Sequence, residues 1–268
     1  MVASLAESRC AVSRESDARR KTRIVQTISH VCVLVTWELL SRFVVPPQFL
    51  PPPSAVARAF WTTTVSGELP RQLWQTGSVL TLGFGAAIVS GMVVGILMGM
   101  FTTLRRVLDP YVSAFNAMPT VALVPLVIIW LGLGFEAKVF LTWLVAVFPV
   151  IINAQIGVAN VSPAFIETAR AFGCNRWQIF RRVILHAAVP FFIAGIRVGL
   201  GRALVGVVVA EMFTALAGLG YMVVFYGNTF RTAELFVPIV VLAVLSIAIT
   251  NLIYRLERWM APWRSVEE

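Results

Sequence analysis

Four long stretches without a charged residue constrain what this chain can fold into. They are Gln72–Leu104, Pro110–Phe135, Val139–Ile166 and Leu235–Tyr254. Each supplies the roughly 20 apolar residues that a helix needs to cross about 30 Å of hydrocarbon. Only 13% of the 268 residues are charged, about half the share typical of a soluble domain. The sequence therefore predicts an all-α membrane protein rather than a soluble protein with buried helices.

Six transmembrane helices are predicted. Their approximate bounds are Ile24–Val45, Ser78–Phe101, Tyr111–Leu131, Val139–Val158, Ala187–Phe213 and Leu235–Tyr254. The first span is irregular because it carries Glu38 and Arg42. With the N-terminus inside, 15 of the 22 Lys and Arg residues fall in inner segments and 4 in outer segments. The positive-inside rule then places both termini in the cytoplasm.

The flanking segments complete the predicted domain organisation. Residues 1–23 form a basic cytoplasmic tail, which lacks the short apolar core and cleavage site of a signal peptide. Residues 24–258 form the transmembrane domain, with a cytoplasmic loop at 159–186, and residues 259–268 form a second cytoplasmic tail. A proline-rich turn follows the first span on the outer side.

Neither catalysis nor metal binding is indicated. Cys10, Cys32 and Cys174 lack paired or zinc-type spacing, and His30 and His186 stand far apart. We therefore predict no catalytic residue and no metal ligand. The net charge of +9 fits the basic cytoplasmic loops of a membrane protein, so no nucleic-acid partner is expected.

Glycines and prolines indicate how the spans pack. Close helix packing is predicted at Gly91, Gly95 and Gly99 in the second span, and at Gly195, Gly199 and Gly206 in the fifth. Glycine stripes let another backbone approach closely, so we expect a tight bundle and also a homodimer. Pro119, Pro125 and Pro149 predict kinks or breaks in or beside the third and fourth spans, since proline removes a helix donor.

The fifth span carries three charges, Arg197, Arg202 and Glu211. Arg197 and Glu211 share a helix face but stand roughly 21 Å apart along it, so they cannot pair with each other. Charged groups inside a membrane must face protein or water. Two alternatives stay open: the charges border a hydrophilic translocation route, or they lie near the ends of the span and snorkel to the interface.

The inner loop between the fourth and fifth spans predicts two short helices with an elbow. Ser162 and Pro163 are a favourable helix start, and Gly173 can adopt the left-handed conformation that ends a helix. Asn175 can cap a second helix that continues into the fifth span. Phe165 and Phe172 are apolar residues on an otherwise polar segment, which is typical of a docking element for a partner.

This loop resembles the EAA loop of ABC importer permeases, whose pattern is E-A-A, three residues, G, nine residues, I, one residue and L-P. Glu167, Ala169, Gly173 and Leu185 match at the required spacing. Thr168, Val183 and His186 replace the usual alanine, isoleucine and proline. With histidine in place of proline, we expect the helix to run straighter into the fifth span. Further segments, among them "AGIRVGLGRALVGVVVAEMF" and "GLGYMV", are similar to permeases of the nitrate, sulfonate and taurine type.

The resemblance implies a type I ABC importer permease, a transport subunit and not an enzyme. Two copies would form the pathway for a small solute in the bacterial inner membrane. Two cytoplasmic ATPase subunits would bind ATP and Mg²⁺ and contact the residues of the coupling loop. An external solute-binding protein would deliver the solute. No G-x-x-x-x-G-K-[ST] pattern occurs in this chain, so we expect it to bind no cofactor of its own.

Two other classes of protein are alternatives to this interpretation. An ion-coupled secondary transporter or a channel would work without an ATPase, and it predicts paired buried acids or an inverted repeat. A membrane enzyme predicts clustered His, Asp or Glu near one surface. Neither pattern stands out in the sequence.

Overall fold

Helices make up nearly all of the regular structure in the computed structural model, which describes residues 25–260 except 27, 30, 47 and 215. The described residues contain no β-strand. The elements are α2 (Pro53–Val65), α3 (Glu68–Met100), α4 (Thr102–Ala117), the 3₁₀ helix η1 (Thr120–Leu123), α5 (Val124–Leu131), α6 (Phe135–Ala159), α7 (Pro163–Ala171), α8 (Arg176–Ile179), the π-helical turn η2 (Phe180–Ile184), α9 (Leu185–Thr214), α10 (Leu219–Asn228) and α11 (Thr232–Met260).

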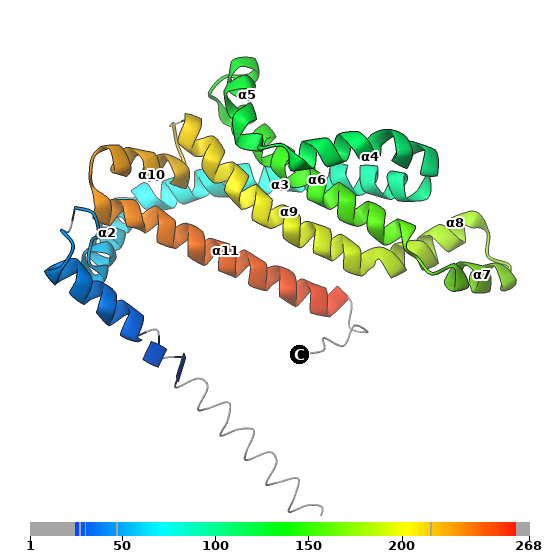
Figure 1. Cartoon of the computed structure of the whole chain (residues 1–268), viewed down its shortest axis with the longest axis horizontal. Coiled ribbons are helices and arrows are strands. Elements are labelled where there is room, and N and C mark those ends of the chain that lie inside the picture. Colours follow the sequence, from blue (N-terminus) through cyan, green and yellow to red (C-terminus); the bar gives the residue numbers. More distant parts are fainter. Residues whose placement is uncertain (1–24, 27, 30, 47, 215, 261–268) are drawn as a thin grey trace, which may run out of the picture.

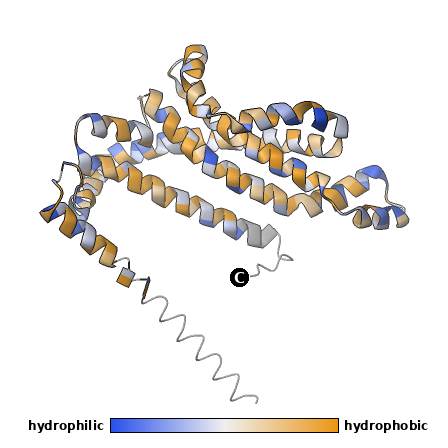
Figure 2. Cartoon of the chain, viewed as in Figure 1, coloured by the Kyte–Doolittle hydropathy of each residue, from blue (hydrophilic) through white to orange (hydrophobic). Residues whose placement is uncertain are grey.

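Four helical segments in the described part are long and apolar enough to cross a membrane. They are Glu68–Met100, Phe135–Ala159, Arg176–Thr214 and Thr232–Arg255. Their ribbons are mostly hydrophobic along their length (Figure 2). α7 and α8 lie at one end of the bundle, whereas α2 and α10 lie at the other (Figure 1). The all-α membrane architecture predicted from the sequence is confirmed.

The third predicted span, Tyr111–Leu131, is broken at Pro119, where the sequence predicted a kink or break. α4 and η1–α5 meet at an angle of 91°, and α5 projects away from the body (Figure 1). Met118 between them is extended, with φ −68° and ψ 138°. A residue before proline is forced out of the helical region, and Pro119 itself has no N–H to donate. α6, in contrast, continues through Pro149 without a break.

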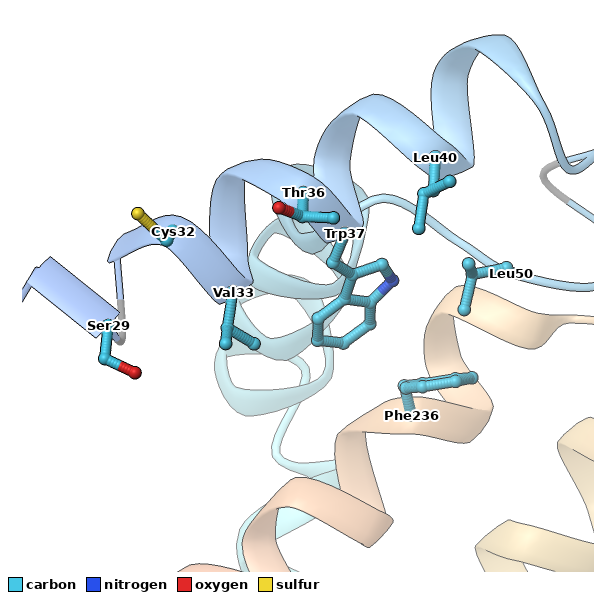
Figure 3. Close-up of a pocket in the computed structure, with 8 residues that line it drawn as sticks. All are labelled: Ser29, Cys32, Val33, Thr36, Trp37, Leu40, Leu50 and Phe236. Carbon is cyan, nitrogen blue, oxygen red and sulfur yellow. The ribbon is translucent and has the colours of Figure 1, made fainter.

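The N-terminal helical segment lies against the start of α11. Part of the predicted first span, Ile24–Val45, lies outside the residues that the structure describes. Within the described part, residues 31–43 are helical. The rings of Trp37 and Phe236 lie 5.6 Å apart between their centroids (Figure 3). The two charges of this segment are satisfied locally, because the Glu38 carboxylate accepts hydrogen bonds from Arg42 Nε (2.7 Å) and from Ser54 Oγ (2.8 Å).

α6 is the central helix, and glycines bring its two main neighbours close to it. α3 and α9 both pack on α6, which is the most buried of the membrane-spanning helices in the described part. A Cβ at Gly95 of α3 would lie 2.5 Å from the Ile151 carbonyl oxygen of α6. A Cβ at Gly199 of α9 would lie 2.9 Å from Cγ2 of Val150. The same holds for the other glycines of both stripes, Gly91, Gly99, Gly195 and Gly206.

Both glycine stripes are therefore covered inside one chain. The surface that these small residues create is occupied by α6, so it is not available to a second copy. A homodimer, if it forms, needs a different face of the protein.

We predict that Gly95→Ala destabilises the protein by about 1–3 kcal/mol, because the added methyl group meets backbone that cannot yield. Gly85→Ala, in the same helix, is the matched control, since its Cβ would meet nothing within 4 Å. Alanine favours helix over glycine by up to about 1 kcal/mol, so Gly85→Ala should not lower the melting temperature in detergent. Equal melting temperatures for the two variants would contradict the packing.

Candidate functional site

The segment from Pro163 to Leu185 forms a compact, capped structure at one end of the bundle. Pro163 occupies the first turn of α7, where its fixed φ suits a helix start. Ser162 makes no side-chain capping hydrogen bond, contrary to the sequence prediction. At the other end Gly173 is left-handed, with φ +75°. Its N–H donates to the Arg170 carbonyl and the Cys174 N–H to the Ala169 carbonyl, which is a Schellman motif.

The second short helix is capped as predicted. The Asn175 side chain accepts from the Gln178 N–H, and the Gln178 side chain accepts from the Asn175 N–H, each at 2.8 Å. This reciprocal capping box fixes the start of α8. From there the chain continues through η2 into α9 as one helical span, Arg176–Thr214. His186, in place of a proline, leaves the helix unbroken, and its Nδ1 lies 3.1 Å from the Arg181 carbonyl oxygen.

This end of the protein exposes large apolar side chains. Phe165 is 60% exposed, Phe172 83% and Trp177 66%. Glu167 and Gly173 are also exposed, whereas Ala169 is buried and Leu185 is half-buried. Large apolar groups this exposed on a short, rigidly capped segment are typical of a surface that another protein covers.

A second polar structure surrounds Glu211, near the opposite end of α9. The Glu211 side chain is fully buried. Its carboxylate accepts hydrogen bonds from Thr76 Oγ1 (2.8 and 3.0 Å to its two oxygens) and from the Gly220 N–H (2.9 Å). A Cβ at Gly218, where φ is +111°, would lie 2.0 Å from the Glu211 Cδ. Only glycine fits against this carboxylate.

Polar groups of α3 and α6 extend this buried cluster to the turn before α10. Gln72 Oε1 accepts from the Gly218 N–H (2.7 Å), and Thr76 Oγ1 accepts from the Leu219 N–H (2.8 Å). Lys138 Nζ donates to the Ala217 carbonyl at 2.9 Å. The cluster thus ties the start of α10 to three membrane-spanning helices. A lone glutamate in an apolar helix signals that such partners exist, but the sequence does not say which residues they are.

The three charges of α9 do not form one site. Arg197 places its guanidinium carbon 4.1 Å from the ring centroid of Tyr254 in α11, a cation–π contact. Glu211 belongs to the buried cluster. Arg202 is exposed and lines a cavity of about 100 Å³ beside η1. Neither alternative left open by the sequence, a bordering hydrophilic route or snorkelling to the interface, describes Glu211, whose side chain is fully buried in the described structure.

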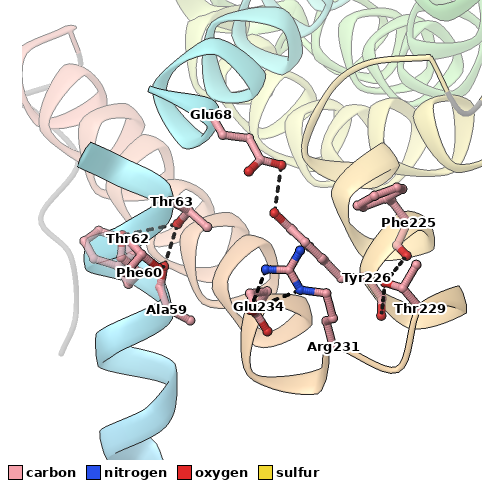
Figure 4. A network of polar contacts seen from close by, with 10 residues as sticks. All are labelled: Ala59, Phe60, Thr62, Thr63, Glu68, Phe225, Tyr226, Thr229, Arg231 and Glu234. Carbon is pink, nitrogen blue, oxygen red and sulfur yellow. Dashed lines mark hydrogen bonds and ion pairs between the residues drawn. The ribbon is translucent and has the colours of Figure 1, made fainter. Parts of the chain in front are cut away.

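A polar network closes the α2–α10 end of the bundle (Figure 4). The Tyr226 hydroxyl of α10 donates to Glu68 at the start of α3, at 2.8 Å. Arg231 forms an ion pair with Glu234 (2.7 Å) and lies 5.0 Å from the Tyr226 ring centroid. Burial and the Glu68 carboxylate hold the pKa of Tyr226 above its usual range, so this phenol stays a hydrogen-bond donor. No group of residues suited to a metal ion occurs in the described part.

Residues 91–266 match a protein family described as the binding-protein-dependent transport system inner membrane component. The chain belongs to this family. Among its relatives, the taurine transport system permease protein TauC of Escherichia coli K12 is 34% identical, with 92% of this chain and 91% of TauC aligned. The riboflavin transport system permease protein RibX of Chloroflexus aurantiacus is 32% identical, with 89% of each chain aligned. The putative aliphatic sulfonates transport permease protein SsuC of Bacillus subtilis is 32% identical over 88% of this chain and 86% of SsuC.

The fold agrees with this family. The structure is similar to a chain of the MetNI methionine ABC transporter in an inward-facing conformation, with a TM-score of 0.61 and 22% identity. The match covers 72% of this chain and 95% of that chain. The type I importer permease fold predicted from the sequence is confirmed. Family membership makes the protein a permease component of a binding-protein-dependent transport system, as predicted.

We predict that Thr76→Val destabilises the permease by about 1–3 kcal/mol, because valine keeps the shape but leaves Glu211 and the Leu219 N–H short of a buried partner. Thr81→Val is the matched control in the same helix. Thr81 is exposed and its hydroxyl bonds only the Gly77 carbonyl of its own helix. The Thr81→Val variant should therefore keep a melting temperature in detergent near that of the wild type. A Thr76 variant as stable as the Thr81 variant would exclude the cluster as a structural anchor.

Proposed function

We propose that this chain is the membrane-spanning permease subunit of an ATP-driven importer and that two copies line the path of a small solute. The observation that carries the proposal is the capped α7–α8 segment with its exposed apolar residues, in a chain that belongs to the importer family. ATP and Mg²⁺ are bound by a separate ATPase subunit, one for each permease copy. The chain itself performs no hydrolysis.

In this proposal α7 is the coupling helix. Phe165 and Phe172 insert into a groove of the ATPase, and Glu167 and Gly173 lie at the same surface. The Schellman motif and the capping box hold α7 and α8 in a fixed relation, so displacement of α7 is transmitted through η2 to α9. ATP binding shifts the equilibrium between the inward-open and outward-open conformations only to the extent that the ATP-bound ATPase contacts the two conformations differently.

The distribution of charge supports an orientation in the inner membrane. Four arginines lie in or beside the α7–α8 segment: Arg170, Arg176, Arg181 and Arg182. By the positive-inside rule this end is cytoplasmic and both termini lie in the cytoplasm. The α2–α10 end then faces outward, where a solute-binding protein delivers its cargo.

A sulfonate-type solute is the best-supported cargo. Two of the relatives are named for taurine and for aliphatic sulfonates, and both kinds of molecule carry a sulfonate group. We propose that this permease imports a small organic sulfonate, with taurine as the first compound to test.

The proposal is tested by ATP-dependent uptake of taurine into vesicles that contain the permease, its ATPase and its binding protein. Gly173→Val should reduce uptake more than about tenfold in a stably assembled permease, because a β-branched residue is strained at φ +75°. Gly173→Asn is the control, since asparagine tolerates the left-handed conformation, and it should retain most of the uptake. Normal uptake by Gly173→Val would show that the elbow does not couple, and failure of the wild type with every sulfonate tested would contradict the proposed cargo.

The ATPase contact is tested by cross-linking. In a permease with Cys10, Cys32 and Cys174 replaced by serine, Phe165→Cys and Phe172→Cys should cross-link to the ATPase with bifunctional thiol reagents. Phe230→Cys is the matched control, because Phe230 is 79% exposed in the turn between α10 and α11, at the opposite end. Absence of cross-links from both Phe165→Cys and Phe172→Cys across a series of reagent lengths would contradict the docking, as would equal cross-linking from Phe230→Cys.

A further inference from the structure

We propose that Arg202 and the cavity beside it form a binding subsite for the anionic group of the transported solute, with selectivity for small organic anions such as sulfonates. The inference rests on the proposed function and deepens it. It locates charge recognition in the membrane-spanning part of this chain, in addition to any recognition by the external binding protein.

The cavity combines one charge with an apolar wall. It measures about 100 Å³ and lies between η1, α6 and α9. Arg202 is its only charged lining residue and Thr120 contributes a hydroxyl group. The remaining lining residues are apolar or glycine: Val121, Val124, Leu141, Val145, Val205, Gly206 and Val209. A guanidinium and a hydroxyl suit the oxygens of a sulfonate, and the valines suit a short alkyl chain.

The depth of Arg202 shows that its face of α9 does not lie against lipid. Arg202 stands roughly 18 Å along the helix axis from Thr214, at 1.5 Å per residue, well inside the apolar span. Val198 (50% exposed), Arg202 and Val205 (62% exposed) lie on one exposed stripe of the helix. An arginine at this depth requires protein or water, so this stripe borders an aqueous path or the second permease copy.

The guanidinium of Arg202 is available to a ligand, whereas that of Arg197 is engaged by another residue. It makes no hydrogen bond or ion pair with any residue that the structure describes. Arg197, on the same helix, is held over the ring of Tyr254 and does not line the cavity. The two arginines therefore separate into one that packs α9 on α11 and one that offers its charge to the cavity.

The break before η1 opens this site. Because the backbone turns by 91° between α4 and η1–α5, Thr120 and Val121 come to lie beside Arg202. A straight third span would carry these residues on a continuous helix with no such corner. The break at Pro119 thus places Thr120 and Val121 in the wall of the cavity that Arg202 also lines.

The charge of the site is tested with a cysteine at its rim. In full-length permease assembled with its ATPase and lacking native cysteines, Val121→Cys is reacted with the anionic reagent ethylsulfonate methanethiosulfonate and with its cationic trimethylammonium counterpart. We expect the rate of labelling by the anionic reagent, divided by the rate with the cationic reagent, to fall about tenfold in Arg202→Gln. In Arg202→Lys this ratio should be retained. Arg197→Gln removes the same charge from the same helix and should leave the ratio unchanged. Butanesulfonate should slow labelling in the Arg202 protein and not in Arg202→Gln.

The outcomes separate the subsite from the proposed function. An unchanged ratio in Arg202→Gln, an equal fall in Arg197→Gln, or labelling insensitive to butanesulfonate overturns the subsite, whatever the uptake assay gives. If the ratio and protection behave as expected while wild-type vesicles import no sulfonate, the anion subsite stands and the proposed cargo fails. In vesicles that import taurine, Arg202→Gln should reduce uptake about tenfold.

Discussion

The close approach of α3 and α9 to α6 is the contact on which the rest of the structure depends. In a bilayer, apolar side chains gain little by leaving lipid for protein, so helix association relies on backbone proximity and on polar contacts. Gly95 and Gly199 provide that proximity on two sides of α6. This three-helix unit then fixes where the ends of α9 lie. One end carries the α7–α8 segment and the other carries the Glu211 cluster.

α9 connects the functional features along a single helix. It receives the capped α7–α8 segment through η2, carries Arg202 along its length, and ends next to Glu211, whose carboxylate holds the turn before α10. The helical span from Arg176 to Thr214 is continuous, so α8, Arg202 and Glu211 lie on one length of helix. In the proposed function, a displacement of the α7 end is carried along this helix toward the cavity and the opposite end of the bundle.

Local signals in the sequence predicted the α7–α8 segment well and the rest of the candidate site poorly. Pro163, Gly173 and Asn175 act through backbone preferences within a few residues, so their effects can be read from the sequence. The side-chain partner of Glu211, Thr76, lies 135 positions earlier in α3, and only the tertiary fold brings the two together. For the third span, Pro119 predicted the break correctly, but not the 91° angle, which depends on packing against α6 and α9.

The interlock of Gly218 and Glu211 also limits how this protein can vary. A side chain at position 218 would overlap the Glu211 carboxylate, which could move only by giving up its hydrogen bonds to Thr76 and the Gly220 N–H. A smaller residue at 211 makes room but leaves the Gly220 N–H and Thr76 without their acceptor. The effects of substitutions at the two positions on stability are therefore not additive. A sequence path that changes both residues passes through a single variant that is less stable than the original protein and than the double variant.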